Sequence, residues 1–211
     1  MKTIKNFGFL AFDDLEELDL VGPWEIINVW REFYDGPENC LIVSENSGVI
    51  NCRKRLKIVA DTNFADCPPL DALLIPGGQG RKAAMNNTNV LQFVQSQAEN
   101  ASAVLSVCTG AFVLHAAGLL ANKRATTHWA SLDELRQTGD VIVAEERFVR
   151  DGKIWTAAGV SAGIDLALAF VAENAGDEVA GQVQFYAEYY PDGKRYGAAH
   201  ESVKAPKYLK Q

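Results

Sequence analysis

The sequence predicts one α/β domain built as a parallel sandwich, with helices on both faces of a central sheet. Short apolar runs, typical of strands buried on both faces, alternate with longer stretches typical of helices. Glycine-rich turns follow several of these runs, and no repeat or low-complexity linker interrupts them. This alternation is typical of parallel sheets with right-handed crossovers. The length of 211 residues suits a single domain, with a core at about residues 4–190 and a tail at about 191–211.

The strands are predicted from their apolar runs. The continuous run at residues 7–12 comes first, and the runs at 40–43, 72–75 and 103–107 follow it as further buried strands. Residues 56–59 are expected to form either an edge strand or one arm of a hairpin. Shorter strands are expected at 125–128, 141–144, 148–149 and 154–156, the last two around the turn Asp151-Gly152.

The helices are predicted from capping signals and apolar spacing. Pro23 suits the first turn of a helix that runs through Trp24, Ile27 and Trp30, after a polar loop at residues 13–19. Further helices are expected at residues 90–99, 109–120, 132–137, 161–173 and 177–189. The tail after Pro191 has no clear period.

The composition excludes several classes of protein. The 27 acidic residues outnumber the 20 basic ones and give a net charge of −7, which argues against a protein that coats nucleic acid. No apolar run reaches the ~20 residues needed to cross a membrane, and the first residues lack the apolar segment of a signal peptide. The four cysteines have no CxxC spacing and no nearby histidine, so we expect reduced cytoplasmic thiols and no metal site.

The candidate functional residues directly follow the buried strands. Parallel strands place their carboxyl ends at one edge of the sheet, and ligands bind outside that edge. The segments expected at this edge are residues 13–19, Pro76-Gly77-Gly78, Cys108-Thr109-Gly110 and His128.

Cys108 stands where a buried strand is expected to give way to a helix of small residues. Such a sharp turn often strains the backbone and projects the side chain over the sheet edge. The positive end of the helix stabilises a thiolate, which predicts a lowered pKa for Cys108. A buried structural cysteine is the alternative, and it is the interpretation we keep for Cys40, Cys52 and Cys67.

The turn Pro76-Gly77-Gly78 is the expected complement of the cysteine. Glycines allow backbone N–H groups to approach a ligand closely. An N–H group of this turn, with that of Thr109, is expected to form a pair that binds developing negative charge. The turn is not a phosphate-binding loop, because no Gly-Lys-Ser/Thr sequence ends it.

The acid candidates are Glu16, Glu17 and Asp19, which follow the first strand. Asp19 either caps the helix after it or acts as an acid, since burial beside a thiol raises the pKa of a carboxyl toward neutrality. His128 either activates Cys108 or lies hydrogen-bonded in the core.

The other histidines and an aromatic cluster have simpler interpretations. His115 lies within an apolar helix and is expected to be structural, and His200 lies in the tail without supporting context. The aromatic cluster belongs to the core, to an interface or to the wall of an apolar pocket, with the core as the default at helical spacing. Its members are Trp24, Trp30, Phe33 and Tyr34.

Four segments together resemble the ThiJ/PfpI superfamily of class I glutamine-amidotransferase-like domains. They are Asp19-Leu20-Val21-Gly22-Pro23, Leu74-Ile75-Pro76-Gly77-Gly78, Val107-Cys108-Thr109-Gly110-Ala111 and Ala125-Thr126-Thr127-His128-Trp129. The resemblance implies a flavodoxin-like three-layer sandwich with a mostly parallel central sheet. Cys108 followed by Thr109, with Asp19 before Leu-x-Gly-Pro, is similar to the isonitrile hydratase branch. PfpI-like proteases carry histidine directly after the cysteine, so Thr109 disfavours a peptidase or a deglycase.

The resemblance also implies an activity. It implies a cofactor-free hydratase that converts a small isonitrile to an N-substituted formamide and that forms a homodimer. Cys108 would act as nucleophile and Asp19 as acid, with Thr109 and Gly78 orienting water or stabilising charge, and with Gly77 and His128 in support. Two alternatives stay open: a glyoxalase-like or deglycase-like enzyme, and a redox or ligand sensor related to the sensing domain of AraC-type regulators.

Overall fold

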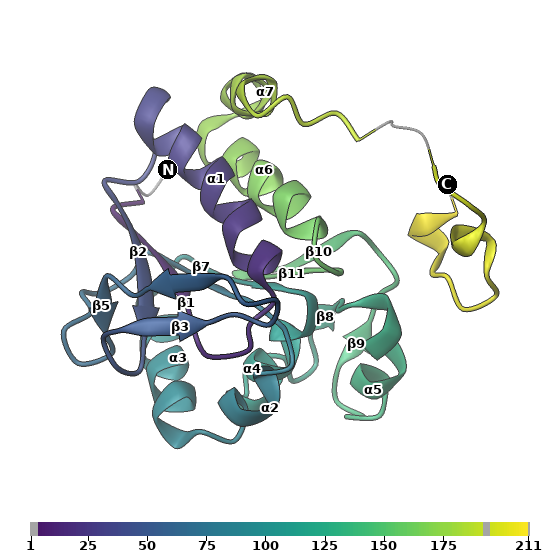
Figure 1. Ribbon diagram of the computed structural model, residues 1–211, viewed down its shortest axis with the longest axis horizontal. Helices are drawn as coiled ribbons and strands as arrows, with labels where there is room; N and C mark the ends of the chain where they lie inside the picture. The colour runs from purple at the N-terminus through teal and green to yellow at the C-terminus, as the bar shows by residue number, and fades with distance from the viewer. Residues whose placement is uncertain (1–3, 192–194, 211) are drawn as a thin grey trace.

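A computed structural model describes residues 4–191 and 195–210, and its centre is a seven-stranded sheet (Figure 1). The strand order is β10-β11-β7-β6-β1-β2-β5. All neighbouring pairs are parallel except β10 and β11, which are antiparallel. The strands are β1 (Asn6–Leu10), β2 (Asn39–Ser44), β5 (Thr62–Asn63), β6 (Ala72–Ile75), β7 (Ala103–Val107), β10 (Phe148–Asp151) and β11 (Ile154–Ala157).

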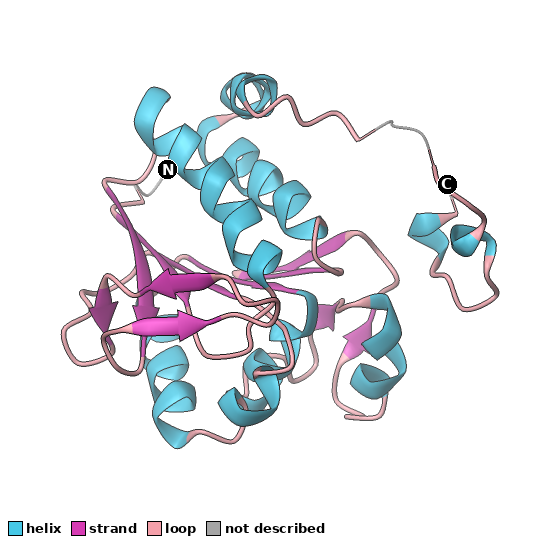
Figure 2. Ribbon diagram, in the orientation of Figure 1, coloured by secondary structure: helices cyan, strands magenta, loops and turns pink. Residues whose placement is uncertain are grey.

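Helices cover both faces of this sheet (Figure 2). One face carries α1 (Glu17–Phe33), α6 (Ala162–Ala175) and α7 (Asp177–Tyr186). The other carries α2 (Arg81–Ala84), α3 (Thr88–Asn100) and α4 (Ala111–Ala116). Alternate strand residues feed two separate apolar cores, since Phe9 and Leu74 pack on the α1 side whereas Leu10 and Leu73 pack on the α3 side. The predicted three-layer sandwich with a mostly parallel sheet is therefore confirmed.

Two small sheets and a short helix extend the sandwich. The hairpin of β3 (Val49–Asn51) and β4 (Lys57–Val59) is antiparallel, so residues 56–59 belong to a hairpin arm. The second pair, β8 (Arg124–Ala125) and β9 (Ile142–Val143), lies near α5 (Leu132–Arg136) (Figure 1). None of the helices in the described part of the chain is both long and apolar enough to span a membrane.

The first helix begins earlier than Pro23 predicts. α1 begins at Glu17, and Asp19 N–H already donates to the Glu16 carbonyl at 3.0 Å. Acidic residues are favourable in the first turn, because they interact with the positive end of the helix. Pro23 therefore lies inside the helix, and residues 17–19 are helical rather than loop.

The segment after β7 is less helical than expected. A 3-10 turn, Cys108–Gly110, precedes α4, which ends at Ala116 rather than near residue 120. The predicted strand at residues 125–128 is limited to Arg124–Ala125, and a 3-10 turn, Trp129–Ser131, follows it. These corrections share a cause: sequence patterns do not show where loops that pack against one another interrupt regular structure.

The aromatic cluster divides between core and surface. Trp30 is 4% exposed and packs edge-on against Phe170, whereas Phe33 is 48% exposed and lies against Tyr186 with ring centroids 4.9 Å apart. Trp24 is partly buried beside Phe9. The core interpretation therefore holds for Trp30 and in part for Trp24 and Tyr34, which pack against the core, but not for Phe33.

Candidate active site

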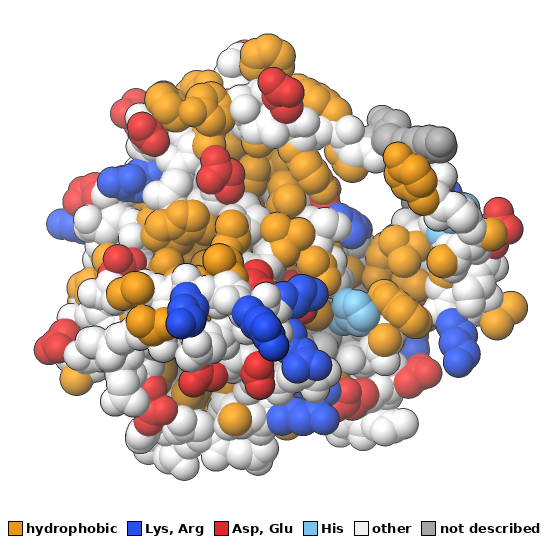
Figure 3. Space-filling view, viewed as in Figure 1, with side chains coloured by type: hydrophobic (Ala, Val, Ile, Leu, Met, Phe, Trp, Pro, Cys, Tyr) orange, Lys and Arg blue, Asp and Glu red, His pale blue; other side chains and the backbone are white. Residues whose placement is uncertain are grey.

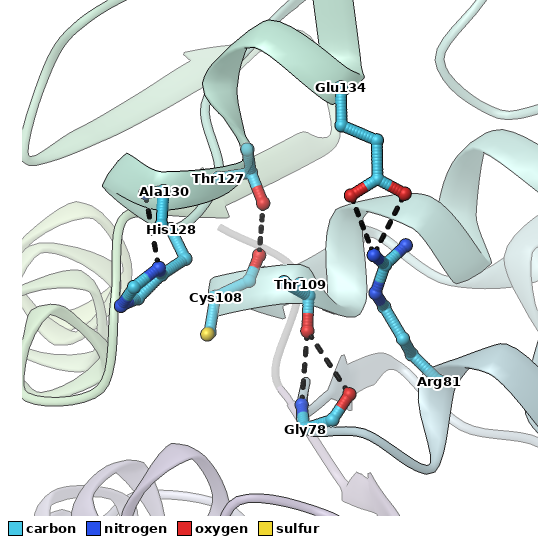
Figure 4. A network of polar contacts seen from close by, with 8 residues as sticks. All are labelled: Gly78, Arg81, Cys108, Thr109, Thr127, His128, Ala130 and Glu134. Carbon is cyan, nitrogen blue, oxygen red and sulfur yellow. Dashed lines mark hydrogen bonds and ion pairs between the residues drawn. The ribbon is translucent and has the colours of Figure 1, made fainter.

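Cys108 occupies a strained turn directly after β7, at the carboxyl edge of the sheet (Figure 4). Its φ of 57° lies in the left-handed region, which is uncommon for residues with a side chain. Its backbone is fixed on both sides, since Cys108 N–H donates to Ala158 O at 2.9 Å and Thr127 Oγ1 donates to Cys108 O at 2.8 Å. Strain of this kind persists where the surroundings over-determine it, as at functional sites.

The glycine turn holds Asp19 and Thr109 beside the cysteine. Gly77 N–H donates to Asp19 Oδ2 at 2.9 Å, and Gly78 N–H donates to Thr109 Oγ1 at 3.0 Å. A Cβ atom at Gly77 would lie 2.5 Å from Thr109 N and 3.0 Å from Asp19 Oδ2, so only glycine fits there without movement. The Gly78 N–H group, predicted to face a ligand, is bound to the Thr109 hydroxyl in this structure.

Asp19 is a fully buried carboxyl inside α1. Burial raises the pKa of Asp19 to about 7, and the nearby charge of Glu16 adds to this, whereas the bonds from Gly77 and from the Cys108 thiol oppose it. Oδ1 is buried and has no hydrogen-bond partner that meets the usual geometry among the described residues. The helix-capping alternative is wrong, because Asp19 follows the helix start and its side chain binds the glycine turn instead.

The pKa of Cys108 is raised to about 12 rather than lowered. Burial is the largest cause and the negative charge of Asp19 is the second. The N–H groups of Thr109 and Val160 and the Thr109 hydroxyl favour the thiolate, but their effect is smaller. The expected lowering is therefore wrong for the resting protein, because a short helix start cannot offset burial beside an acid.

Val160 is a site residue that the sequence did not reveal. Its N–H group acts on the Cys108 sulfur, and its φ of 51° is a rare value for a β-branched residue. Val160 lies in the loop after β11, 52 residues beyond Cys108 in the sequence. Only the apolar run that predicts β11, whose carboxyl end lies beside that of β7, could have pointed to it.

His128 lies close to the site but is turned toward its own loop. Its Nδ1 accepts from Ala130 N–H at 3.2 Å, and its ring packs against Gly159. Burial lowers the pKa of His128, which favours the neutral ring. Figure 4 draws the ring to one side of the Cys108 sulfur with no bond between the two.

The other sequence candidates serve different purposes. Glu16 pairs with Lys54, and Glu17 accepts from the Lys54 backbone N–H, so both acids anchor the β3–β4 hairpin. His115 Nε2 bonds to Asp140 at 2.8 Å, away from the sheet edge. No group of three or more His, Cys, Asp or Glu side chains suited to a metal occurs in residues 4–191 and 195–210.

The fold and the site define a class of protein. It is a flavodoxin-like α/β protein with a strained cysteine and a buried carboxyl at the carboxyl edge of its sheet. A thiol and a carboxyl in this arrangement can share one proton. The backbone N–H groups of Thr109 and Val160 can stabilise negative charge on the sulfur.

The chain belongs to the DJ-1/PfpI family, whose model matches residues 5–173. It is 40% identical to the isonitrile hydratase of Pseudomonas putida over 195 residues, which are 88% of this chain and 79% of that protein. A ThiJ/PfpI family protein from Pseudomonas syringae has a similar structure, with a TM-score of 0.86 and 32% identity over 96% of this chain and 82% of that one. The regulator CdhR of Pseudomonas aeruginosa is 27% identical over 85% of this chain, which spans 53% of that regulator.

Proposed function

We propose that the protein hydrates small isonitriles to N-substituted formamides with Cys108 as nucleophile. The 40% identity to an isonitrile hydratase supports an isonitrile hydratase-like enzyme. The proposed role of Cys108 rests on one observation: buried Asp19, with a pKa of about 7, lies beside the Cys108 thiol. A carboxyl with this pKa both accepts and donates a proton at neutral pH.

The first step forms a covalent thioimidate. The thiol proton passes to Asp19, which delivers it to the lone pair of the isonitrile carbon. The sulfur adds to that carbon, one C–N π pair moves to nitrogen, and the product is R–N=CH–S–Cys108. The N–H groups of Thr109 and Val160 support this step, because they favour negative charge on sulfur while the bond forms.

The second step adds water and releases the product. Asp19 takes a proton from water as the oxygen attacks the thioimidate carbon, and the nitrogen gains that proton. The C–S bond then breaks, a C=O bond forms, and the hydroxyl proton returns through Asp19 to sulfur. The sum is one isonitrile and one water to one formamide, with no redox change, so the reaction needs no cofactor.

Thr109 and the glycine turn are proposed to orient that water. The Thr109 hydroxyl accepts from Gly78 N–H at 3.0 Å and donates to Gly78 O over a long 3.4 Å, and its proton would turn from that carbonyl toward the water. Gly77 supports the acid by its bond to Asp19, and His128 supports the site from its position against Gly159. We place this activity in the cytoplasm, where the four free thiols remain reduced.

We propose a homodimer formed through the α1 and α6 face. Figure 3 shows hydrophobic side chains gathered over α1, α6 and the β3–β4 hairpin. Their exposed members include Leu18, Val21 and Val59, at 39%, 37% and 63% exposure. Contiguous exposed apolar surface of this kind is typical of an interface. Light scattering on purified protein tests it: one peak at twice 23.0 kDa is expected, and a monomer would contradict it.

A ligand-sensing role is the second candidate, favoured by the similarity to CdhR. One experiment separates the two. Purified protein is incubated with cyclohexyl isonitrile, and N-cyclohexylformamide is measured by mass spectrometry against a blank without protein. Catalytic turnover, with many formamides per protein, is expected. Saturable binding of the isonitrile without formamide would overturn the enzyme and support the sensor.

A further inference from the structure

The C-terminal segment packs beside the candidate active site instead of forming an extended tail. Two 3-10 turns, Ala199–Glu201 and Lys207–Leu209, shape it, and they lie on the α5 side of the molecule (Figure 1). Pro206 is buried, and Tyr208 is half-buried against the apolar core on the α1 side of the sheet. The segment therefore has a fixed face toward the rest of the domain.

An apolar cavity of about 420 Å³ lies under this segment. Trp129 forms its wall on the domain side, and Ala199, Ala205 and Leu209 contribute apolar atoms from the segment. Trp129 is 41% exposed even with the segment in place, so its ring remains accessible from the cavity. The volume lies within the range of cavities that hold small molecules.

Two short stretches of chain connect the cavity to the surroundings of Cys108. Trp129 directly follows His128, whose ring packs on Gly159, and the next residue, Val160, directs its N–H at the sulfur. On the other side, Tyr208 packs against the apolar core that contains Cys108. Leu209 thus lines the cavity, and its neighbour Tyr208 packs against the core that contains the cysteine.

We infer that this cavity receives the hydrocarbon substituent of the substrate and that Trp129 and Leu209 select its size. The inference rests on the proposed function. An isonitrile is linear through carbon, nitrogen and the first substituent atom, so its substituent projects straight away from the attacked carbon. A cyclic or branched alkyl or aryl group would bury itself against Trp129 and Leu209, whereas a methyl group would not reach them. The preferred substrates are therefore isonitriles with bulky apolar substituents.

Paired substrates and matched variants test this inference. We expect kcat/KM to be higher for cyclohexyl isonitrile than for methyl isonitrile. Trp129→Ala and Leu209→Ala should lower the ratio of the two values about tenfold, chiefly through the KM of the cyclohexyl substrate. Lys207→Ala, an exposed change on the same turn as Leu209, should leave the ratio within twofold. A ratio unchanged in both cavity variants would overturn the inference.

A second measurement does not depend on turnover. Cys108 is alkylated with N-cyclohexylmaleimide or N-methylmaleimide, and peptide mass mapping follows its modification. The cyclohexyl reagent should modify wild-type Cys108 faster than the methyl reagent does, and this difference should disappear in Trp129→Ala. The unfolding midpoint of the variant is measured in parallel. If the wild type makes no formamide but shows this selectivity, the proposed function fails while the cavity assignment stands. If the wild type makes formamide but neither ratio responds to the variants, only the cavity assignment fails.

Discussion

Cys40 and Cys108 belong to the same domain and have thiol groups of similar acidity in different surroundings. Burial raises the pKa of both to about 12. Cys40 lies within β2, and the only charge that acts on it is that of Arg31, among the residues described. Cys108 lies at a positive φ, with N–H groups directed at its sulfur and a buried acid beside it.

Because the two thiols have similar pKa values, the pKa alone does not identify the nucleophile in this protein. Neither thiol is ionised in the resting state at pH 7, which limits its oxidation. Cys108 differs because Asp19 can take its proton during the reaction and because nearby N–H groups favour the thiolate as it forms. The reactivity proposed for Cys108 therefore depends on its neighbours rather than on an ionised resting state.

The largest expected effect separates the two cysteines directly. Cys108→Ala should lower formamide production at least about 10³-fold, because the covalent route is lost. Cys40→Ala should stay within about twofold of the wild type, since Cys40 lies on β2 rather than at the carboxyl edge that follows β7. Formamide release by both purified variants is measured by mass spectrometry. Equal activity in the wild type and Cys108→Ala would show that Cys108 is not the nucleophile and does not differ from Cys40 in function.

Asp19→Asn should lower kcat/KM about 10²-fold, because the amide cannot carry the proton between sulfur and substrate. In the wild type, kcat/KM should fall as pH drops through about 7, since a carboxyl that is already protonated cannot accept the thiol proton. That inflection should disappear in the variant. A pH profile shared by both proteins would exclude Asp19 as the proton carrier.

The same substitution tests the Asp19 pKa without activity. The folded-state pKa of about 7 exceeds the ordinary 3.8, so the folded protein binds the extra proton more tightly and loses stability as pH rises from about 4 to 7. Asp19→Asn removes this loss. Its unfolding midpoint should exceed that of the wild type by several degrees at pH 8, and the gap should shrink toward pH 4. A gap that is constant with pH would contradict the raised pKa.

Gly77→Ala tests whether the glycine turn holds the acid in place. The added Cβ would lie 2.5 Å from Thr109 N, so the turn must shift and the bond from residue 77 to Asp19 must lengthen. We expect about tenfold lower kcat and a loss of about 1–3 kcal/mol in the free energy of unfolding. Gly181→Ala is the control, because nothing lies within 4 Å of a Cβ there. If Gly77→Ala kept the wild-type kcat, the close approach of Gly77 to Thr109 and Asp19 would have no consequence for catalysis.

Much of the fold could be predicted from local pattern. Apolar runs locate the central strands, because residues buried on both faces leave no polar alternation. The expected strain at Cys108 is confirmed, since it follows from a sharp turn after a buried strand. Asp19 has the raised pKa expected of a carboxyl that is buried beside a thiol. The early start of α1 was missed because Glu16, Glu17 and Asp19 suit a loop as well as a first helical turn.

The rest of the site depends on contacts between distant segments. Val160 acts through its backbone N–H, and a main-chain group leaves no mark in the choice of side chain. The thiol pKa was predicted with the wrong sign because its two main causes, burial and the Asp19 charge, depend on how closely α1 approaches β7. The position of Tyr208 over the core depends likewise on tertiary packing, and the tail has no period that predicts it.

The smallest expected effect concerns the rate at which the two thiols are alkylated. Asp19 raises the pKa of Cys108 by its charge, so Asp19→Asn should lower that pKa and enlarge the thiolate fraction at pH 8. Iodoacetamide should then modify Cys108 a few-fold faster in the variant, as followed by peptide mass mapping, while Cys40 reacts at its wild-type rate. A slower reaction of Cys108 would mean that Asp19 assists the thiol in the resting protein by taking its proton. In that case proton transfer to Asp19, rather than repulsion by its charge, would already separate Cys108 from Cys40 before any substrate binds.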